Sequence, residues 1–385
     1  MPHLSALPAE LVRDIVYAFL EENPAHVDRV PNLASLARVN RNFHALANPL
    51  LYRKLLLDTP RRSQILATLH GNPTLAREVR QLTLFGGELS VEDFDSMKEV
   101  LSRCINVISL TYLCFDTWFL PALTAFIAKT WSSRLRYLRC DRKEGLWDLL
   151  CQSPSLEELV ASSIDFPSRL PSGQSTTSLL TPKPSFHLRR FDSGSSPLVD
   201  NFEALLSSSQ DSLVELDLPI SSLSPLPDLS AFPCLANLTL TLAERYIPHS
   251  RDSRTPGVPV IDERDDLRCL QRVKATLRRI EGRGHGSLRK LELYQPNYHR
   301  TRAFTSADVA EVDVLEAIPA SVRTLDLSTL ELDQAYVRKR LGLQAEREGS
   351  KLIAKGLGTL ILQRAGLSSE TETKLGKRSV EVVWV

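Results

Sequence analysis

The fold is decided by the stretch Val79-Arg-Gln-Leu82-Thr-Leu84-Phe-Gly-Gly-Glu-Leu89, whose apolar residues follow the spacing Leu-x-x-Leu-x-Leu. Side chains alternate across an extended strand, so Leu82 and Leu84 point to the same face. Val79 lies three residues before this pair and Leu89 five residues after it, where the chain turns into and out of the strand. One such unit cannot bury its apolar face alone, but stacked copies can.

The same spacing recurs towards the end of the chain, with other apolar residues replacing leucine in places. Several copies are followed by a helical pattern, such as the one formed by Phe94, Met97, Val100 and Leu101 after Ser90. Further helices are predicted around Trp147 and Phe202, over residues 308–318 and over residues 332–343. The copies begin at Val79, Ile105, Leu135, Leu156, Leu188, Leu213, Leu235, Leu288, Val322, Leu357 and Val380.

This recurrence resembles a leucine-rich repeat array over residues 79–385. The resemblance implies an α/β fold, an irregular solenoid with a parallel inner sheet and outer helices. The chain departs from the family pattern in its uneven repeat lengths and at the ninth repeat position, where the family has Asn or Cys. The side-chain ladder that satisfies the turn backbone is therefore missing. The ninth position is occupied by Gly87, Leu113, Ser221, Leu330 and Ala365.

Three stretches interrupt the repeats. Residues 166–186 are rich in Ser, Thr and Pro and are predicted to form a mobile loop, and residues 243–264 also have the composition of a loop. Residues 265–281 form a basic helix with Arg268, Arg272, Lys274, Arg278 and Arg279 on it. Neighbouring acidic residues favour a solvated face over the alternative, a nucleic-acid patch.

The N-terminal stretch of residues 7–53 carries a pattern of two helices. Pro8 suits the first turn of a helix, where its missing N–H is not needed, and Leu11 and Ile15 follow at helical spacing. A second helix is predicted over residues 33–46, with Asn48-Pro49 closing it because the residue before a proline avoids the α region. We expect a helical domain over residues 1–57, a linking helix over residues 58–78 that Gly71-Asn72-Pro73 ends, and the solenoid over residues 79–385.

In its order of residues this stretch resembles an F-box. The matching positions are Leu7, Pro8, Glu10, Leu11, Ile15, Leu36, Val39, Arg41, Phe43 and Leu46. Residues 21–32 are longer than the usual linker between the first two helices of the family. The resemblance implies that the segment docks on the Skp-family adaptor of a cullin ubiquitin ligase. The adaptor contacts that it implies are Leu7, Pro8, Leu11, Ile15, Leu36, Val39, Phe43 and Leu46, although some of these could instead hold the two helices together.

The composition excludes several classes of protein. The chain has 385 residues, of which 43% are hydrophobic and 24% charged, as in an ordinary globular protein. The formal net charge of +1 is too small to indicate a nucleic-acid or anionic-membrane partner. Acidic residues occur within the N-terminal stretch, where a signal peptide would have a basic and then an apolar region. No apolar run is long enough to span a membrane. We therefore expect a cytoplasmic or nuclear location.

No motif for catalysis or metal binding stands out. The six cysteines form no Cys-x-x-Cys pair and are expected to be reduced thiols, and the eight histidines lack metal-ligand spacing. Gly282-Arg-Gly-His-Gly286 has the wrong spacing for a phosphate-binding loop and is better interpreted as a helix-to-strand turn. We expect no enzymatic activity, no cofactor and no metal, unless distant residues assemble a site.

The substrate-binding surface is expected on the inner strands, where residues beside each Leu-x-Leu pair point away from the core. Several of these residues are acidic, which suggests that the partner has a basic segment. The alternative is that this concave face is exposed to solvent and binds nothing. The candidates are Phe85, Arg139, Asp141, Asp192, Asp217, Glu292, Tyr294 and Asp326.

Two functions remain open at this point. In the first, the chain is a substrate receptor that binds the Skp-family adaptor through the F-box, a cullin through that adaptor, and a protein substrate through the repeats. In the second, it is a non-catalytic scaffold whose N-terminal helices cap the apolar end of the solenoid. The two differ in surface: capping predicts that Leu7, Pro8 and Leu11 are buried against residues 55–69, whereas a receptor exposes them as an apolar patch.

Overall fold

The chain folds as two compact units, Met1–Leu156 and Glu157–Val385. The structure is a computed structural model, and it describes residues 8–22, 26–58, 61–86, 91–113, 119–141, 145–161, 183–194, 202–220, 228–242, 264–282, 287–294, 311–330, 357–362, 376 and 380–384.

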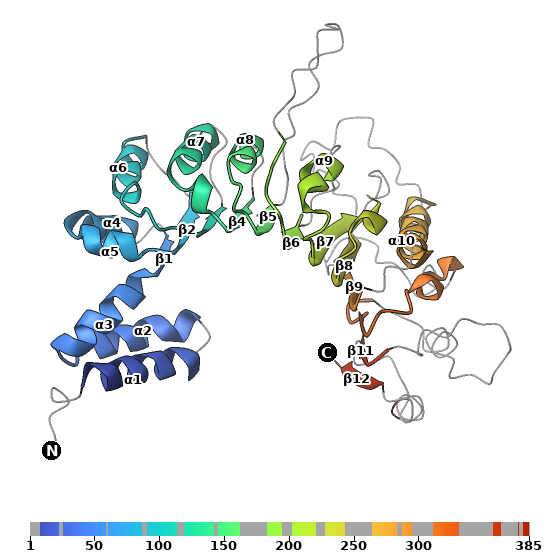
Figure 1. Cartoon of the computed structure of the whole chain (residues 1–385), viewed down its shortest axis with the longest axis horizontal. Helices are drawn as coiled ribbons and strands as arrows, with labels where there is room; N and C mark the ends of the chain where they lie inside the picture. Colours follow the sequence, from blue (N-terminus) through green and yellow to red (C-terminus); the bar gives the residue numbers. More distant parts are fainter. Residues whose placement is uncertain are drawn as a thin grey trace, which may run out of the picture. The chain divides into compact units, whose positions relative to one another are not determined.

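The first unit begins with three helices, which are α1 (Ala9–Glu22), α2 (His26–Ala37) and α3 (Arg41–Tyr52). Four parallel strands follow and pair in chain order: β1 (Lys54–Leu57), β2 (Gln81–Phe85), β3 (Ser109–Leu113) and β4 (Tyr137–Cys140). The segments after these strands carry α4 (Arg62–Gly71), α5 (Pro73–Glu78), α6 (Val91–Leu101), α7 (Leu120–Thr130), the short 3₁₀ helix η2 (Ser132–Arg134) and α8 (Leu146–Cys151). Figure 1 shows α4 to α8 along one side of these strands.

The second unit repeats this arrangement with longer and less regular connections. Its parallel strands pair in chain order from β5 to β12. They are β5 (Glu158–Ala161), β6 (Arg190–Asp192), β7 (Glu215–Ile220), β8 (Asn237–Leu242), β9 (Lys290–Tyr294), β10 (Thr324–Asp326), β11 (Thr359–Leu362) and β12 (Glu381–Trp384). The helical elements are α9 (Phe202–Leu206), η3 (Ser207–Ser209), η4 (Leu229–Ala231), α10 (Arg264–Gly282) and η5 (Val314–Ala317).

The repeated leucines form the core of both units. Leu82 and Leu84 of β2 are each 1% exposed, while the residues between and beside them are partly exposed. Strand β8 behaves in the same way, with Leu238 and Leu240 buried. Every copy that the spacing predicts contains a strand, and all of these strands are parallel. The prediction of a mixed α/β fold built from stacked parallel-strand units is therefore confirmed.

A backbone ladder joins successive units where each strand begins. The carbonyl oxygen of Arg53 accepts hydrogen bonds from the N–H groups of Arg80 and Gln81, both at 3.0 Å. The carbonyl of Arg80 in turn accepts from Ile108 and Ser109, at 2.9 and 3.1 Å. The pattern repeats at the entrances of the later strands, so main-chain groups satisfy one another where no side-chain ladder exists.

The N-terminal helices differ from the prediction of two helices. Residues 33–46 do not form one helix, because Asn40 separates α2 from α3. The Oδ1 atom of Asn40 accepts from the N–H groups of Asn42 at 2.9 Å and Phe43 at 3.0 Å, which is a helix N-cap. Pro49 lies inside α3 and does not end the helix before it. Residues 26–32, predicted as part of a long linker, belong to α2.

The boundary between the helical domain and the repeats also differs from the prediction. Residues 54–57 form β1, which pairs with β2, so the sheet begins within the stretch predicted to be helical. The linking segment contains two helices, since α4 ends at Gly71 and α5 begins at Pro73. Asn72 ends the first of these and accepts a hydrogen bond from the N–H of Leu75 at 3.3 Å as the N-cap of the second.

The interrupting stretches are described in part. Residues 166–182 and 243–263 lie outside the described residues, as does the helix predicted over residues 332–343. Phe186, at the end of the predicted mobile loop, is fully buried, so that end of the segment belongs to the core. The helix predicted over residues 308–318 contains η5, after a left-handed residue at Asp313 with φ 57°. The basic helix over residues 265–281 is confirmed as α10.

Candidate protein-interaction surfaces

The first candidate surface is the outer side of α1. Leu11 and Ile15 lie four residues apart on one face of this helix and are 50% and 43% exposed. Val12 and Val16 of the same helix are buried with Leu33 and Phe43 in a small core shared by α1, α2 and α3. The helices therefore have a core of their own and still expose apolar side chains to solvent.

The adaptor contacts implied by the F-box resemblance divide into three groups. Pro8, Leu11, Ile15 and Val39 are exposed, Val39 to 46%. Leu36 and Leu46 are half-buried against the helical core, and Phe43 is 3% exposed within it. The burial of Phe43 agrees with the alternative for this residue, in which its ring holds the helices together. Leu7 lies outside the described residues.

The N-terminal helices join the strands through α3, which packs against α5 and β1. The capping alternative predicts instead that Pro8 and Leu11 are buried against residues 55–69. Both are exposed, so the apolar side of α1 is not the surface that covers the end of the sheet. An exposed apolar face on an otherwise packed helix is typical of a protein-binding surface.

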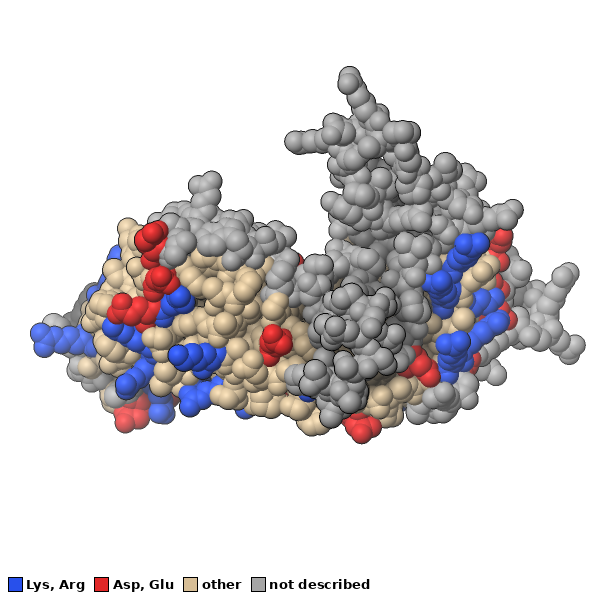
Figure 2. Space-filling view, turned by 90° about the horizontal axis from the view of Figure 1, so that it is seen from above, with Lys and Arg blue, Asp and Glu red and all other residues tan. Residues whose placement is uncertain are grey.

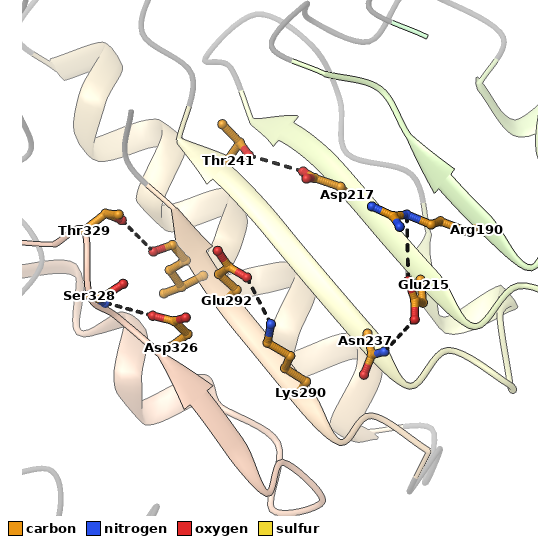
Figure 3. Close-up of polar contacts among 11 residues, drawn as sticks. Arg190, Glu215, Asp217, Asn237, Thr241, Lys290, Glu292, Asp326, Ser328 and Thr329 are labelled. Atoms are coloured by element: carbon orange, nitrogen blue, oxygen red, sulfur yellow. Dashed lines mark hydrogen bonds and ion pairs between the residues drawn. The ribbon is translucent and has the colours of Figure 1, made fainter. Parts of the chain in front are cut away.

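The second candidate surface is the face of β6 to β10 that points away from the helices that the structure describes in this unit. Strand register places Asp192 beside Asp217, Asp217 beside Thr239, Thr239 beside Glu292, and Glu292 beside Asp326. These residues form one row across five neighbouring strands, and we call it the acidic row. In Figure 3 its labelled acidic side chains project from the face of the strands opposite to the helix behind them. With strands about 4.8 Å apart, the row spans about 19 Å.

A more mixed row lies two residues earlier on the same strands. It consists of Arg190, Glu215, Asn237, Lys290 and Thr324 in register. Figure 3 shows its contacts: Glu215 is 3.8 Å from Arg190 and accepts from Asn237 at 3.1 Å, and Lys290 is 3.3 Å from Glu292 of the acidic row. The two rows together present two basic side chains against five acidic ones, so this face is negatively charged.

Asp217 is the most perturbed carboxyl group on this face. Burial raises its pKa to about 7, and the neighbouring charges of Asp192 and Glu292 act in the same direction. A hydrogen bond from the hydroxyl of Thr241 at 3.2 Å and the charge of Arg190 oppose the shift. The acidic row therefore has one member whose charge changes close to neutral pH.

The structure brings together some of the predicted substrate residues and not others. Asp192, Asp217, Glu292 and Asp326 share the acidic row, and Tyr294, 38% exposed, lies two residues beyond Glu292 on β9. Phe85, Arg139 and Asp141 belong to the first unit, where Phe85 and Asp141 are half-buried and Arg139 is exposed. The sequence prediction did not include the residues of the mixed row. Their shared repeat position, two residues before that of the acidic row, could have identified them. The missed residues are Arg190, Glu215, Asn237 and Lys290.

Two basic residues of α10 make contacts within the second unit. Lys274 and Arg278 both pair with Glu316 of η5, at 3.0 and 2.9 Å, and Lys274 also donates to the carbonyl oxygen of Val312 at 2.9 Å. In Figure 2 the basic side chains in the part of the view that holds α10 lie next to acidic ones. These contacts favour the interpretation of a balanced, solvated helix face over a nucleic-acid patch.

The described part of the chain contains no helix that is long and apolar enough to cross a membrane. Over the same residues, no group of His, Cys, Asp and Glu side chains is placed to hold a metal ion.

Comparison with known proteins identifies no family for this chain. No protein-family model matches it, and no curated protein does. Among solved structures, it is similar to a crystal structure of a TLR13–ssRNA13 complex, with 13% sequence identity over 82% of this chain and a TM-score of 0.34. The match covers 34% of that chain, so this chain spans about a third of its length.

Proposed function

We propose that this chain is the substrate-recognition subunit of an SCF-type cullin ubiquitin ligase. In this proposal the three N-terminal helices act as an F-box that binds a Skp-family adaptor, and the strands act as leucine-rich repeats that bind a protein substrate. The observation that supports it best is the apolar face of α1, with Leu11 and Ile15 about half exposed on helices that already have their own core.

The mechanism of such a subunit is to raise effective concentration. The chain would perform no bond chemistry itself and would hold substrate lysines close to the ubiquitin-loaded enzyme. This role requires two binding surfaces on one chain, and in this proposal they are the apolar face of α1 in the first unit and the acidic row in the second. Ligases of this type act in the cytosol and the nucleus, and we place the chain there.

The acidic row is the proposed substrate contact. An extended peptide advances about 3.3 Å per residue, so a segment of about six residues would span its length. Lysine and arginine side chains on such a segment would meet Asp192, Glu292 and Asp326, and Tyr294 would offer an aromatic contact beside them. We therefore propose a substrate with a basic, extended recognition segment.

The adaptor side is tested by co-purifying the intact chain with a Skp-family adaptor. The informative variant is Ile15→Asp, and the matched control is Ile105→Asp, because Ile15 and Ile105 are 43% and 44% exposed and Ile105 lies outside the N-terminal helices. A charge placed in an apolar interface is expected to reduce adaptor affinity by about tenfold to a hundredfold. The control variant should bind as the unmodified chain does.

The result separates the two functions. Stoichiometric adaptor binding that Ile15→Asp weakens by about tenfold or more and Ile105→Asp preserves would establish the receptor. If the folded, intact chain does not bind the adaptor, the receptor proposal fails and a non-catalytic scaffold for protein interactions becomes the better explanation. Circular dichroism of each variant distinguishes loss of binding from loss of fold.

A further inference from the structure

A cavity of about 340 Å³ lies in the first unit, and the proposed adaptor and substrate surfaces do not account for it. It is lined by residues of α1 and α3 and by the residues that lead into β1 and β2. Val16, Leu46, Pro49 and Leu50 form an apolar wall. The remaining lining includes the charged side chains of Arg13, Arg53, Arg80 and Glu78. Its volume is in the range of small-molecule sites, about 300–1,000 Å³.

Arg53 and Arg80 occupy neighbouring positions in the backbone ladder. Each comes directly before a strand, since Lys54 of β1 is in register with Gln81 of β2, and the N–H of Arg80 donates to the carbonyl of Arg53 at 3.0 Å. Like charges at adjacent positions of paired strands destabilise a fold. In the part of the chain that the structure describes, neither guanidinium has a hydrogen bond or ion pair that would offset this repulsion.

The charge of the cavity selects the kind of ligand. The lining holds three arginines and one glutamate, an excess of two positive charges, and Arg13 also forms an ion pair at 3.9 Å with Asp14, which does not line the cavity. A phosphate monoester carries a charge of about −1.5 to −2 at neutral pH and matches this excess, whereas a carboxylate supplies a single charge. The planar fork of arginine also suits the oxygen atoms of a phosphate.

We propose that this cavity binds a small phosphate monoester, with the phosphate held by Arg53, Arg80 and Arg13 and its apolar part against the wall formed by α3. Arg13 lies two residues from both Leu11 and Ile15, on the opposite side of α1. The arginines of the site therefore lie away from the exposed apolar face of α1, while Leu46 of the apolar wall is also one of the adaptor contacts that the F-box resemblance implies. The inference does not depend on the proposed function.

The test is isothermal titration calorimetry of the intact chain with phenyl phosphate, in a phosphate-free buffer of low ionic strength. Phenol and inorganic phosphate are the two half-ligand probes. We compare the double variant Arg53→Gln, Arg80→Gln with the matched control Arg189→Gln, Arg289→Gln. Arg189 and Arg289 also come directly before strands, and their main-chain groups donate and accept hydrogen bonds in the same backbone ladder. Both side chains are exposed, and neither lines the cavity.

Phenyl phosphate is expected to bind more tightly than either probe, and the Arg53, Arg80 double variant is expected to lose affinity by about tenfold or more. The control double variant should keep full affinity. Absence of phenyl phosphate binding, or an equal loss in both double variants, would overturn the inference. Arg13→Gln provides a second variant at a side chain that is 59% exposed and tolerant of change; unaltered affinity there would also contradict a site of three arginines.

Discussion

The guanidinium Nη2 of Arg62 donates a hydrogen bond to the carbonyl oxygen of Phe85 at 2.7 Å, and to that of Gly86 at 3.2 Å. Arg62 is the first residue of α4 and is 8% exposed, while Phe85 ends β2. A positive charge at a helix N-terminus opposes the helix dipole, so this placement costs some helix stability. In return, the side chain ties the helix after β1 to the end of the next strand.

Replacement of Arg62 by methionine should therefore destabilise the first unit. The apolar stem would remain, but two carbonyl groups at the end of β2 would lose their donor, which costs about 1–3 kcal/mol of the free energy of unfolding. Urea unfolding followed by circular dichroism measures the change. Arg61→Met, at the exposed neighbouring position, is the control and should be within about 0.5 kcal/mol of the unmodified chain.

Gly145→Ala should also destabilise the first unit. Gly145 precedes α8 with φ +70°, and a Cβ atom there would lie 2.6 Å from the Oγ1 of Thr124, which is buried. We expect a loss of about 1–3 kcal/mol from the left-handed backbone and the collision together. At Gly71, the last residue of α4, a Cβ would meet nothing within 4 Å, so Gly71→Ala should leave thermal stability unchanged or slightly raised.

The raised pKa of Asp217 predicts a dependence of stability on pH. In the folded chain its pKa is about 7, against 3.8 for an ordinary aspartate, so the folded state holds the proton more tightly. Stability from this group is present at low pH and is lost as the pH rises from about 4 to about 7. The variant Asp217→Asn should not lose stability in this pH range, because asparagine does not ionise. Its side-chain amide oxygen can still accept the hydrogen bond from the hydroxyl of Thr241.

At about pH 8 this variant is expected to be more stable than the unmodified chain, by on the order of 2 kcal/mol, and at about pH 4 the difference should be small. Urea unfolding at the two pH values measures it. Asp211→Asn is the control at an exposed carboxyl group. Equal stability of Asp217→Asn and the unmodified chain at both pH values would contradict the raised pKa.

Neutralising the acidic row should weaken binding of a basic segment. We expect the triple variant Asp192→Asn, Glu292→Gln, Asp326→Asn to bind an oligo-arginine peptide about tenfold more weakly at low ionic strength. The asparagine at position 326 keeps the acceptor for the N–H of Ser328, which limits structural damage. Fluorescence anisotropy of a labelled peptide measures the affinity.

The control for this experiment makes the same change of charge elsewhere. Glu92→Gln, Asp211→Asn, Glu381→Gln neutralises three exposed acids outside the row and should leave the affinity nearly unchanged. If both triple variants lose affinity equally, the peptide responds to overall charge and the acidic row is not a specific contact.

Much of the fold could be predicted because each repeat carries its own signal. In Leu213-Val-Glu-Leu216-Asp-Leu218, the alternation alone predicts a strand with its leucines buried and Asp217 on the opposite face, and both features are present. The shared repeat position of Asp192, Asp217, Glu292 and Asp326 likewise anticipates their common face. The strand β1 was missed because Leu55 and Leu57 follow a helix directly, and because the position three residues before Leu55 holds Tyr52, where the other copies have Leu, Ile or Val.

The sequence by itself therefore determined the strands β2 to β12, their buried faces and the apolar positions of the N-terminal helices, because periodicity is a local property. The tertiary structure alone decided which apolar side chains stay exposed, burying Phe43 and leaving Leu11 accessible. It alone raised the pKa of Asp217 through neighbours on other strands. It also placed Arg53 and Arg80 with Arg13 around one cavity. These features depend on contacts between residues far apart in the chain, and no local spacing encodes them.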